Sequence, residues 1–312
     1  MFVNRGSSLF KYSLFCILII FSSVIVAIDY DYPYLINGGA PSYFLADQSF
    51  DSSLSVFEND GYISDFRKIQ LGVFHTSAFK SLNTKSISLE FNIFKNTFLG
   101  VSYCSILDSA IEKNSINTAD IDNPFFTSEY YNYENNHSKI TLKQRFNKRM
   151  SFGFSLNFYE TIVDSFNGSA IDFSFGSVFL FKYMDLGISF QNRFGSTINF
   201  EGITETIPQL GIINIRAKPF YWMNVSMRAT HIKSTYDRVR SILFGTGVHV
   251  VPIKFFTFSL GVVEQFEALD IKAVPAIGIK FNLRTIHVDY VYKKMDYKPS
   301  SDAHLVAMKF KL

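Results

Sequence analysis

The 312-residue sequence contains little cysteine and lacks the short motifs of common cofactor sites. Its two cysteines are Cys16 and Cys104, and Cys16 lies in an N-terminal segment that we expect to be removed. The mature chain can therefore form no intramolecular disulfide. There is no P-loop, no dinucleotide-binding glycine fingerprint and no paired-cysteine metal motif. We accordingly expect no disulfide framework, no cofactor and no metal.

A catalytic site is also poorly supported. The six histidines lack the spacing of metal ligands; they are His75, His137, His231, His249, His287 and His304. His287 and Asp289 share a face of one expected strand, as do the histidine and carboxylate of a hydrolytic triad. No serine in a nucleophile-elbow context accompanies them, and polar residues routinely pair inside barrels. We therefore expect that the protein is not an enzyme.

Positive and negative charges are nearly equal in number. Of 30 Lys and Arg residues, Arg5 and Lys11 lie in the N-terminal segment, which leaves 28 against 27 Asp and Glu, or +1. That balance gives no indication of a nucleic-acid partner.

Tryptophan occurs once, whereas there are 35 Phe and 17 Tyr, and such aromatic enrichment favours β-strands.

The chain begins like a secreted protein. Arg5 and Lys11 precede the apolar run 12–26, and small residues surround its end. This order is typical of a signal peptide, predicted here to be cleaved after Ala27. An uncleaved anchor helix is the alternative, but the run falls short of the ~20 residues that span a bilayer. Residues 28–66 show no sustained period, and we interpret them as a plug or a periplasmic arm.

From residue 67 to 312, apolar and polar residues alternate with a period of two, which predicts strands with one apolar and one polar face. In the segment 171–181, for example, the odd positions are mostly Phe and the even positions mostly polar or glycine. Fourteen segments share the pattern: 67–77, 85–95, 97–107, 137–146, 150–162, 169–181, 185–194, 209–217, 220–231, 239–250, 253–263, 272–282, 285–293 and 303–312. No helical period of comparable length follows the signal peptide.

The connections between these segments alternate in length. Tight links are expected at Asn96, 147–149, 182–184, 218–219, 251–252 and 283–284. Longer links are expected at 78–84, 108–136, 163–168, 195–208, 232–238, 264–271 and 294–302. Outer-membrane barrels show this asymmetry, with tight periplasmic turns and longer extracellular loops. A soluble β-sandwich also alternates apolar and polar residues, but it has no reason to sort its loops by length.

We therefore predict an all-β fold, a transmembrane antiparallel up-and-down β-barrel of about 14 strands in the bacterial outer membrane, with an N-terminal plug or arm. The phenylalanine-rich face would contact outer-membrane lipid, and the polar face would surround a lumen. An aromatic belt is expected from residues near strand ends: Tyr159, Tyr183, Tyr221, Trp222, Tyr290 and Tyr292. Candidates for lining the lumen are Glu90, Asn92, Asn157, Asn224, Arg228 and Asp289.

Several stretches between Lys139 and Leu312 resemble the PorV/PorQ-type outer-membrane proteins, relatives of the FadL long-chain fatty-acid transporters. The stretches are IDFSFG at 171–176, MDLGISFQNRFGSTINF at 184–200, Ile207-Pro208, HVDYVY at 287–292 and HLVAMKFKL at 304–312. The last resembles the C-terminal signal read by the outer-membrane assembly machinery, with Leu312 in place of the usual aromatic residue. Near the N-terminus, Phe57-Glu-Asn-Asp-Gly61 stands where the family usually has an Asn-Pro-Ala-Gly motif.

The resemblance implies a fourteen-stranded barrel with an N-terminal segment near or inside the lumen. It implies one of two functions: passive transport or binding of hydrophobic small molecules, or a role in protein secretion and surface attachment. In the second case secreted proteins would contact the loop 108–136. A surface-exposed structural porin or antigen without dedicated cargo is a third hypothesis.

Overall fold

A computed structural model describes residues 59–63, 68–78, 82–116, 125–200, 203–233, 242–267, 270–293 and 303–312. The predicted signal peptide, its cleavage at Ala27 and most of the segment 28–66 lie outside these residues. No helix in the described part of the chain is long and apolar enough to cross a membrane.

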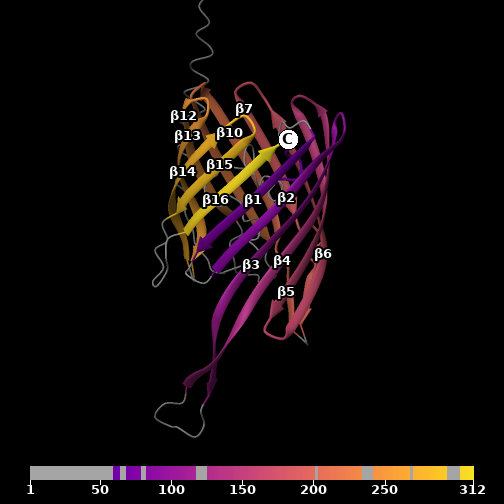
Figure 1. Ribbon diagram of the computed structural model, residues 1–312, viewed down its shortest axis with the longest axis vertical. Coiled ribbons are helices and arrows are strands. Elements are labelled where there is room, and N and C mark those ends of the chain that lie inside the picture. Colours follow the sequence, from indigo (N-terminus) through magenta and orange to yellow (C-terminus); the bar gives the residue numbers. More distant parts are fainter. Residues whose placement is uncertain are drawn as a thin grey trace, which may run out of the picture.

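Fourteen antiparallel strands form one closed barrel, which confirms the predicted fold class (Figure 1). The wall strands are β1 (Ile69–Ala78), β2 (Leu82–Phe94), β3 (Thr97–Ile116), β4 (Phe125–Asn147), β5 (Met150–Val163), β6 (Phe166–Leu180), β7 (Met184–Gln191), β10 (Gln209–Phe220), β11 (Met223–Lys233), β12 (Ile242–Ile253), β13 (Phe256–Glu267), β14 (Asp270–Asn282), β15 (Ile286–Lys293) and β16 (Ala303–Lys311). A separate hairpin, β8 (Thr197–Phe200) with β9 (Ile203–Thr206), lies between β7 and β10.

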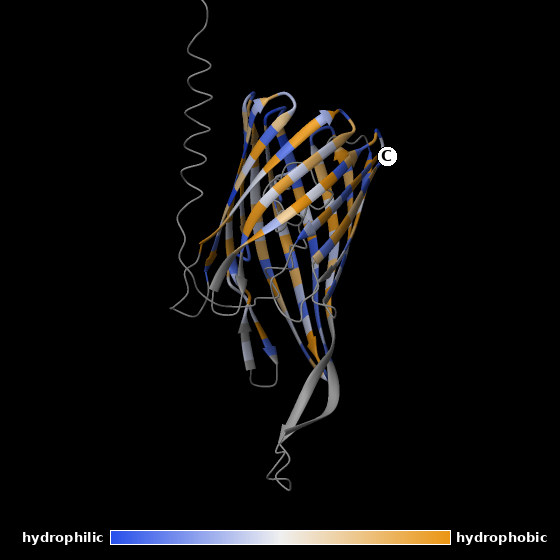
Figure 2. Ribbon diagram, turned by 90° about the vertical axis from the view of Figure 1, so that its left-hand side faces the viewer, coloured by the Kyte–Doolittle hydropathy of each residue, from blue (hydrophilic) through white to orange (hydrophobic). Residues whose placement is uncertain are grey.

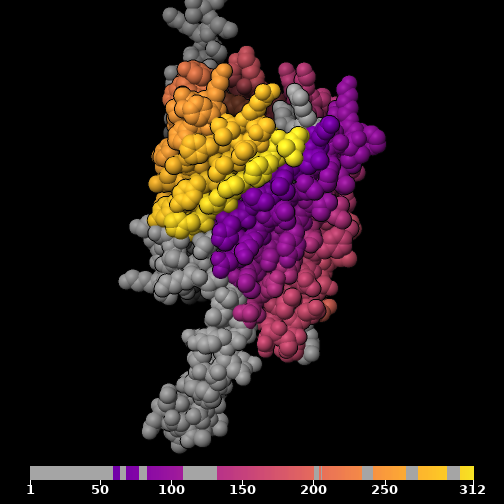
Figure 3. Space-filling view, viewed as in Figure 1, coloured from indigo at the N-terminus to yellow at the C-terminus, as the bar shows by residue number. Residues whose placement is uncertain are grey.

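The barrel closes between its first and last strands. β1 pairs with β16 from Gln70 opposite Lys311 to Ser77 opposite His304. The backbone N–H of Leu312 donates to the carbonyl of Ile69 at 2.9 Å, which extends the pairing to the end of the chain. Figure 3 shows the yellow β16 directly against the indigo β1. Closure removes the two sheet edges that would otherwise expose unpaired backbone groups.

All fourteen predicted strands are present, but two of the tight turns lie further along the chain than predicted. The turns fall at Tyr221–Trp222 and 254–255 rather than at 218–219 and 251–252. Pro219 and Pro252 are instead the penultimate residues of β10 and β12, where the register shifts. Proline has no N–H to donate, and a strand accepts it where the hydrogen-bond ladder is already interrupted.

Three of the predicted long links are shorter or more ordered than expected. The link 163–168 is a two-residue turn at Asp164 and Ser165, with Asp164 at a φ of 56°. The link 195–208 contains the β8–β9 hairpin. The link 108–136 is largely a continuation of β3 and β4, which pair out to Ile116 opposite Phe125 and extend well beyond the barrel wall (Figure 1).

The two faces of the wall differ in exposure and composition. Hydrophobic and hydrophilic residues alternate in bands along the strands (Figure 2). Large apolar side chains on the outside are strongly exposed, including Leu142 at 54%, Phe154 at 52% and Ile171 at 55%. The alternate positions are buried and mostly polar in β2 to β7. This arrangement fits a barrel whose outer surface contacts lipid.

Of the six residues expected in an aromatic belt, five face outward and one faces inward. Tyr183, Tyr221, Trp222 and Tyr290 are exposed on the outside, and Tyr292 is partly exposed. Tyr159 is 4% exposed and points inward, where its hydroxyl donates to Asn192 Oδ1. Its position in β5 has the parity of the buried positions, so its side chain faces the interior.

Replacing Phe154 with arginine tests the lipid contact of the outer face. Phe154 lies inside β5 on the exposed face and stacks on Phe173, with 5.5 Å between ring centroids. A cationic side chain near the middle of a bilayer costs about 2–4 kcal/mol, and near the interface only about 0–1 kcal/mol. We expect the free energy of unfolding in lipid vesicles to decrease by an amount within the range for the bilayer interior. Tyr221→Arg, in a turn, is the matched control; equal losses for both variants would contradict lipid contact at Phe154.

Candidate functional site

A tight turn from the N-terminal segment, Asn59–Tyr62, lies inside the barrel near the short-turn end; we call it the N-terminal turn. Asn59 closes it, because its Oδ1 accepts from the N–H of Gly61 at 2.9 Å and its carbonyl accepts from the N–H of Tyr62 at 3.0 Å. Asn59 Nδ2 donates to the carbonyl of Ser177 in β6 at 3.1 Å. Asn59 and Asp60 are fully buried.

Glycines allow the N-terminal turn to touch the backbone of the wall. A Cβ on Gly61 would lie 2.6 Å from the carbonyl oxygen of Gly176 in β6. A Cβ on Gly153 in β5 would overlap the carbonyl of Asp60, and one on Gly176 would overlap Asn59 Oδ1. Ser151 adds a hydrogen bond, donated from its hydroxyl to the carbonyl of Gly61 at 2.6 Å. The fit therefore depends on three positions without side chains.

Charged groups fix the same turn. Asp60 forms an ion pair with Lys139 of β4, and both side chains are at most 1% exposed. Lys143, four residues further along β4, donates to the carbonyl of Tyr62 at 2.8 Å and pairs with Glu90 of β2 at 3.0 Å. Buried charges are costly unless they are paired, so these ions hold β2, β4 and the N-terminal turn in one arrangement.

The aromatic ring of Tyr62 completes the contact. It packs on Val178 of β6, and the Lys309 ammonium of β16 lies 5.8 Å from its ring centroid. The N-terminal turn thus contacts β4, β5, β6 and β16, which include strands on both sides of the closure between β1 and β16, and it is linked to β2 through Lys143. It occupies the interior as a plug would.

The predicted lumen-lining residues fall into different environments. Glu90, Asn157 and Asp289 are at most 3% exposed, and Glu90 belongs to the contact with the N-terminal turn. Asn157 Nδ2 donates to the hydroxyl of Ser174 at 2.6 Å, and its Oδ1 accepts from His137 Nε2 at 3.0 Å. Asn92, Asn224 and Arg228 are partly exposed; Arg228 Nε donates to the hydroxyl of Thr230 at 2.8 Å. Of these six residues, Glu90 is the one linked to the N-terminal turn, through Lys143.

The histidine and carboxylate considered as part of a triad have other contacts. His287 Nδ1 lies 2.7 Å from Asn282 Oδ1 at the end of the preceding strand. Within the described ranges, no three His, Cys, Asp or Glu side chains gather in a way that would hold a metal ion.

Asp172 of β6 anchors the place where β7 leaves the wall. β6 and β7 pair only from Phe175 opposite Phe190 to Leu180 opposite Asp185. Beyond this, the fully buried carboxylate of Asp172 accepts from the N–H groups of Phe194 at 3.0 Å and Ser196 at 2.9 Å. These two N–H groups lie beyond the paired part of β7, so the Asp172 carboxylate takes the place of a neighbouring strand as their hydrogen-bond acceptor.

Replacing Asp172 with alanine is expected to release this connection. Hydrogen bonds to a charged group contribute about 1.5–3 kcal/mol each, and two would be lost together with an acceptor for buried N–H groups. We expect much faster proteolysis within 192–208 while the barrel remains folded. Asp164→Ala, in the exposed turn after β5, is the control. Unchanged cleavage in the Asp172 variant would contradict the anchoring role.

The interior also carries an apolar surface, the inner apolar patch, on β10 to β16. Its centre is a buried cluster of Leu210, Ile212, Ile232 and Leu243. Further buried apolar side chains lie on the inward face of the later strands, interrupted by the buried Lys293 between Ala276 and Ala303: Val263, Val274, Ala276, Val291, Ala303 and Leu305. All of them lie in the half of the wall near the long loops. The opposite wall, β2 to β6, is lined mainly by hydroxyl, amide and charged groups, although Phe98, Ile106 and Val178 also lie buried on it.

The sequence did not predict the principal contacts of the plug. Asp60, Lys139 and Lys143 were not among the candidates, although Lys139 and Lys143 share the polar parity of β4 with Thr141. Lysines at the inward positions of a strand indicate buried anionic partners, so the sequence of β4 already contained this signal. Which carboxylates they meet depends on residues far away in the sequence, since Glu90 is 53 positions from Lys143 and Asp60 is 79 positions from Lys139.

No protein-family model matches the chain, and no curated protein sequence matches it significantly. Solved structures do. The toluene transporter TodX of Pseudomonas putida has a TM-score of 0.61 and 9% identity, over 88% of this chain and 98% of TodX. The toluene transporter TbuX of Ralstonia pickettii has a TM-score of 0.59 and 9% identity, over 84% and 94%. A FadL homologue of Pseudomonas aeruginosa has a TM-score of 0.54 and 10% identity, over 91% and 98%.

At such low identity these similarities establish the fold alone. They span nearly the whole of each compared structure, and the described barrel has the same closed architecture. The expected relation to FadL-like barrels is thus confirmed at the level of fold: the chain is a fourteen-stranded barrel of the kind found in FadL homologues and hydrocarbon transporters.

Proposed function

We propose that the protein is a passive conduit for hydrophobic small molecules in the bacterial outer membrane. The observation that carries the proposal is the inner apolar patch. A general porin needs a wet, polar lumen, whereas this barrel has a buried apolar surface over seven consecutive strands. Fold neighbours that transport toluene make a compact aromatic hydrocarbon a reasonable first cargo to test.

The N-terminal turn supports a second element of the proposal, in which residues 28–66 act as a plug. The turn lies near the short-turn end, and the inner apolar patch lies near the long loops. A molecule entering from the long-loop side would therefore meet apolar side chains first and the N-terminal turn afterwards. Short turns face the periplasm in barrels of this type, so the plug restricts the periplasmic exit.

Uptake into liposomes tests the conduit. Vesicles containing the folded protein and an enclosed toluene-oxidising reporter should take up toluene faster than empty vesicles. Ile212→Asn, which places an amide in the inner apolar patch, should reduce the protein-dependent rate several-fold. The amide would lose its hydration whenever an apolar molecule passes over the patch, and desolvation of a polar group without a hydrogen-bond partner is unfavourable. Thr141→Asn, on the polar wall, is the matched control. Equal rates with and without protein would refute the proposal.

The β3–β4 hairpin favours a second candidate, a role in protein secretion or surface attachment. The resemblance to PorV/PorQ-type proteins suggests the same role. A long two-stranded ribbon beyond the barrel wall has backbone edges that can accept a strand from another chain (Figure 1). Photocrosslinkers placed at residues 113 and 129 should capture a specific secreted protein in cells if this candidate is correct. A conduit without such a role would yield no specific adduct.

A further inference from the structure

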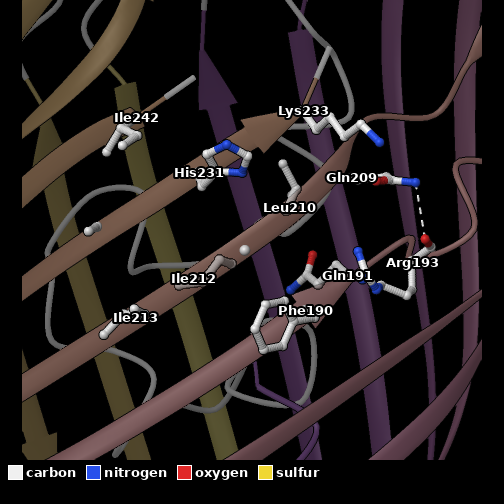
Figure 4. A pocket seen from close by; sticks show the side chains of 12 residues that line it. Phe190, Gln191, Arg193, Gln209, Leu210, Ile212, Ile213, His231, Lys233 and Ile242 are labelled. Carbon is white, nitrogen blue, oxygen red and sulfur yellow. Dashed lines mark hydrogen bonds between the residues drawn. The ribbon is translucent and has the colours of Figure 1, made fainter. Parts of the chain in front are cut away.

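The outer surface of the wall has a hollow of about 320 Å³ across β7, β10, β11 and β12 (Figure 4). It lies close to the ends of these strands that carry the long loops. Its volume falls at the lower end of the 300–1,000 Å³ that is typical of small-molecule sites. The strand register explains why a hollow forms here.

Four outward positions make one row across the four strands. Phe190 lies opposite Gly211, Gly211 opposite His231, and His231 opposite Ile242. Gly211 has no side chain to fill the space between Phe190 and His231. In the next row towards the short turns, Ile213 lies opposite Ala229, which is also small. Phe190 and Ile213 are 38% and 48% exposed, so the hollow opens outward with an apolar floor.

The rim on the long-loop side is basic. Arg193 follows β7, Lys233 ends β11, and both are exposed. Gln209 lies opposite Lys233, and its Nε2 donates to the carbonyl of Arg193 at 3.0 Å, which holds the end of β7 beside the hollow. The lining contains no Asp or Glu. Among the residues that the structure describes, the ion pairs involve neither Arg193 nor Lys233.

We propose that this hollow binds one phosphate-bearing, acylated lipid of the outer leaflet. An acyl chain would lie on Gly211, Ile213 and Ala229, with the phosphate against Arg193 and Lys233. The order of the groups supports this occupant, because the apolar floor lies towards the middle of the barrel wall and the cations lie towards the long loops. That is the order of acyl chain and headgroup in an outer leaflet. The proposal rests on the outer-membrane setting proposed above, but not on transport.

Native mass spectrometry of the full protein, released from detergent, tests the proposal. The probe is lipid A, an acylated glucosamine disaccharide with two phosphates; its dephosphorylated form and phosphatidylethanolamine are compared at equal concentration. The double variant Arg193→Gln/Lys233→Gln should retain lipid A about twenty-five-fold less, since each basic residue beside an anionic lipid contributes roughly fivefold. Gly211→Leu should also lose retention, because its Cβ fits without overlap, 3.7 Å from Phe190 Cε1, and the larger side chain fills the hollow.

Lys254→Gln, in the turn between β12 and β13 at the opposite end of the wall, is the matched control and should retain lipid A fully. Two results would overturn the proposal. One is equal retention of lipid A by the wild type, the double variant and Gly211→Leu. The other is equal retention by the wild type of phosphorylated and dephosphorylated lipid, which would show that the cations do not select the headgroup. Toluene uptake by the double variant should be unchanged, so failure here is distinct from failure of the conduit.

Discussion

Replacing Gly153 with alanine is expected to displace the N-terminal turn and open the barrel to ions. The methyl group would overlap the carbonyl of Asp60, which is backbone and cannot rotate away. The turn contacts the wall over several strands, so a misfit at this point should weaken Asn59, Asp60 and Tyr62 together. Single-channel recordings in planar bilayers should change from small or absent currents to large, frequent openings.

Gly100→Ala is the matched control for this experiment. Gly100 also faces the interior, from β3, but its Cβ would lie 3.6 Å from Thr141 Cβ, an ordinary contact. This variant should conduct like the wild type. Heat-modifiable migration on a detergent gel verifies that both barrels are folded. If Gly153→Ala stays closed while folded, the described turn does not block the lumen.

Removing the Lys143 ammonium is expected to cause the largest loss of stability. Lys143→Met would leave the Glu90 carboxylate without its ion pair and the Tyr62 carbonyl without a donor, both in the interior. Breaking a buried ion pair by removing one partner typically costs about 3–5 kcal/mol. We expect a decrease of that size in the free energy of unfolding, measured by denaturant titration in lipid vesicles.

The double variant Glu90→Gln/Lys143→Met separates the charge from the packing. Removing both charges abolishes the unpaired carboxylate, so most of the lost stability should return. Glu160→Gln, at an exposed position of β5, controls for the general removal of a carboxylate and should change stability little. If Lys143→Met is as stable as the wild type, water or another cation must neutralise Glu90, and the ion pair does not hold β2 and β4 together.

Local pattern was sufficient for the wall of the barrel. Alternation of side chains with a period of two is a property of each strand by itself, so all fourteen strands were predictable without knowledge of their neighbours. The failures in the wall have local causes that the pattern does not contain. Tyr159 satisfied the composition of an aromatic belt but has the inward parity. Pro219 and Pro252 indicated turns, yet the strands continue past them because the register shifts there.

The interior was much less predictable, because its contacts join residues that are distant in the sequence. Asn59 meets Ser177 across 118 positions, and Ser151 meets Gly61 across 90. Glu90 was selected as an inward polar residue, but nothing in β2 indicates that its partner is Lys143. The β8–β9 hairpin was missed for a similar reason, since the buried Ile198 of β8 and Ile207, which follows β9, pack on Tyr159 of a different strand.

The amino-acid sequence alone determined that the chain forms an even number of strands with one apolar and one polar face, because this information is local and repeats along the chain. Only the tertiary structure decided which residues lie inside the barrel and where its inner and outer surfaces form apolar or basic patches. The seat of the N-terminal turn, the inner apolar patch and the basic-rimmed hollow each combine residues from several strands. Strand register, which sets those combinations, exists only once the barrel has closed.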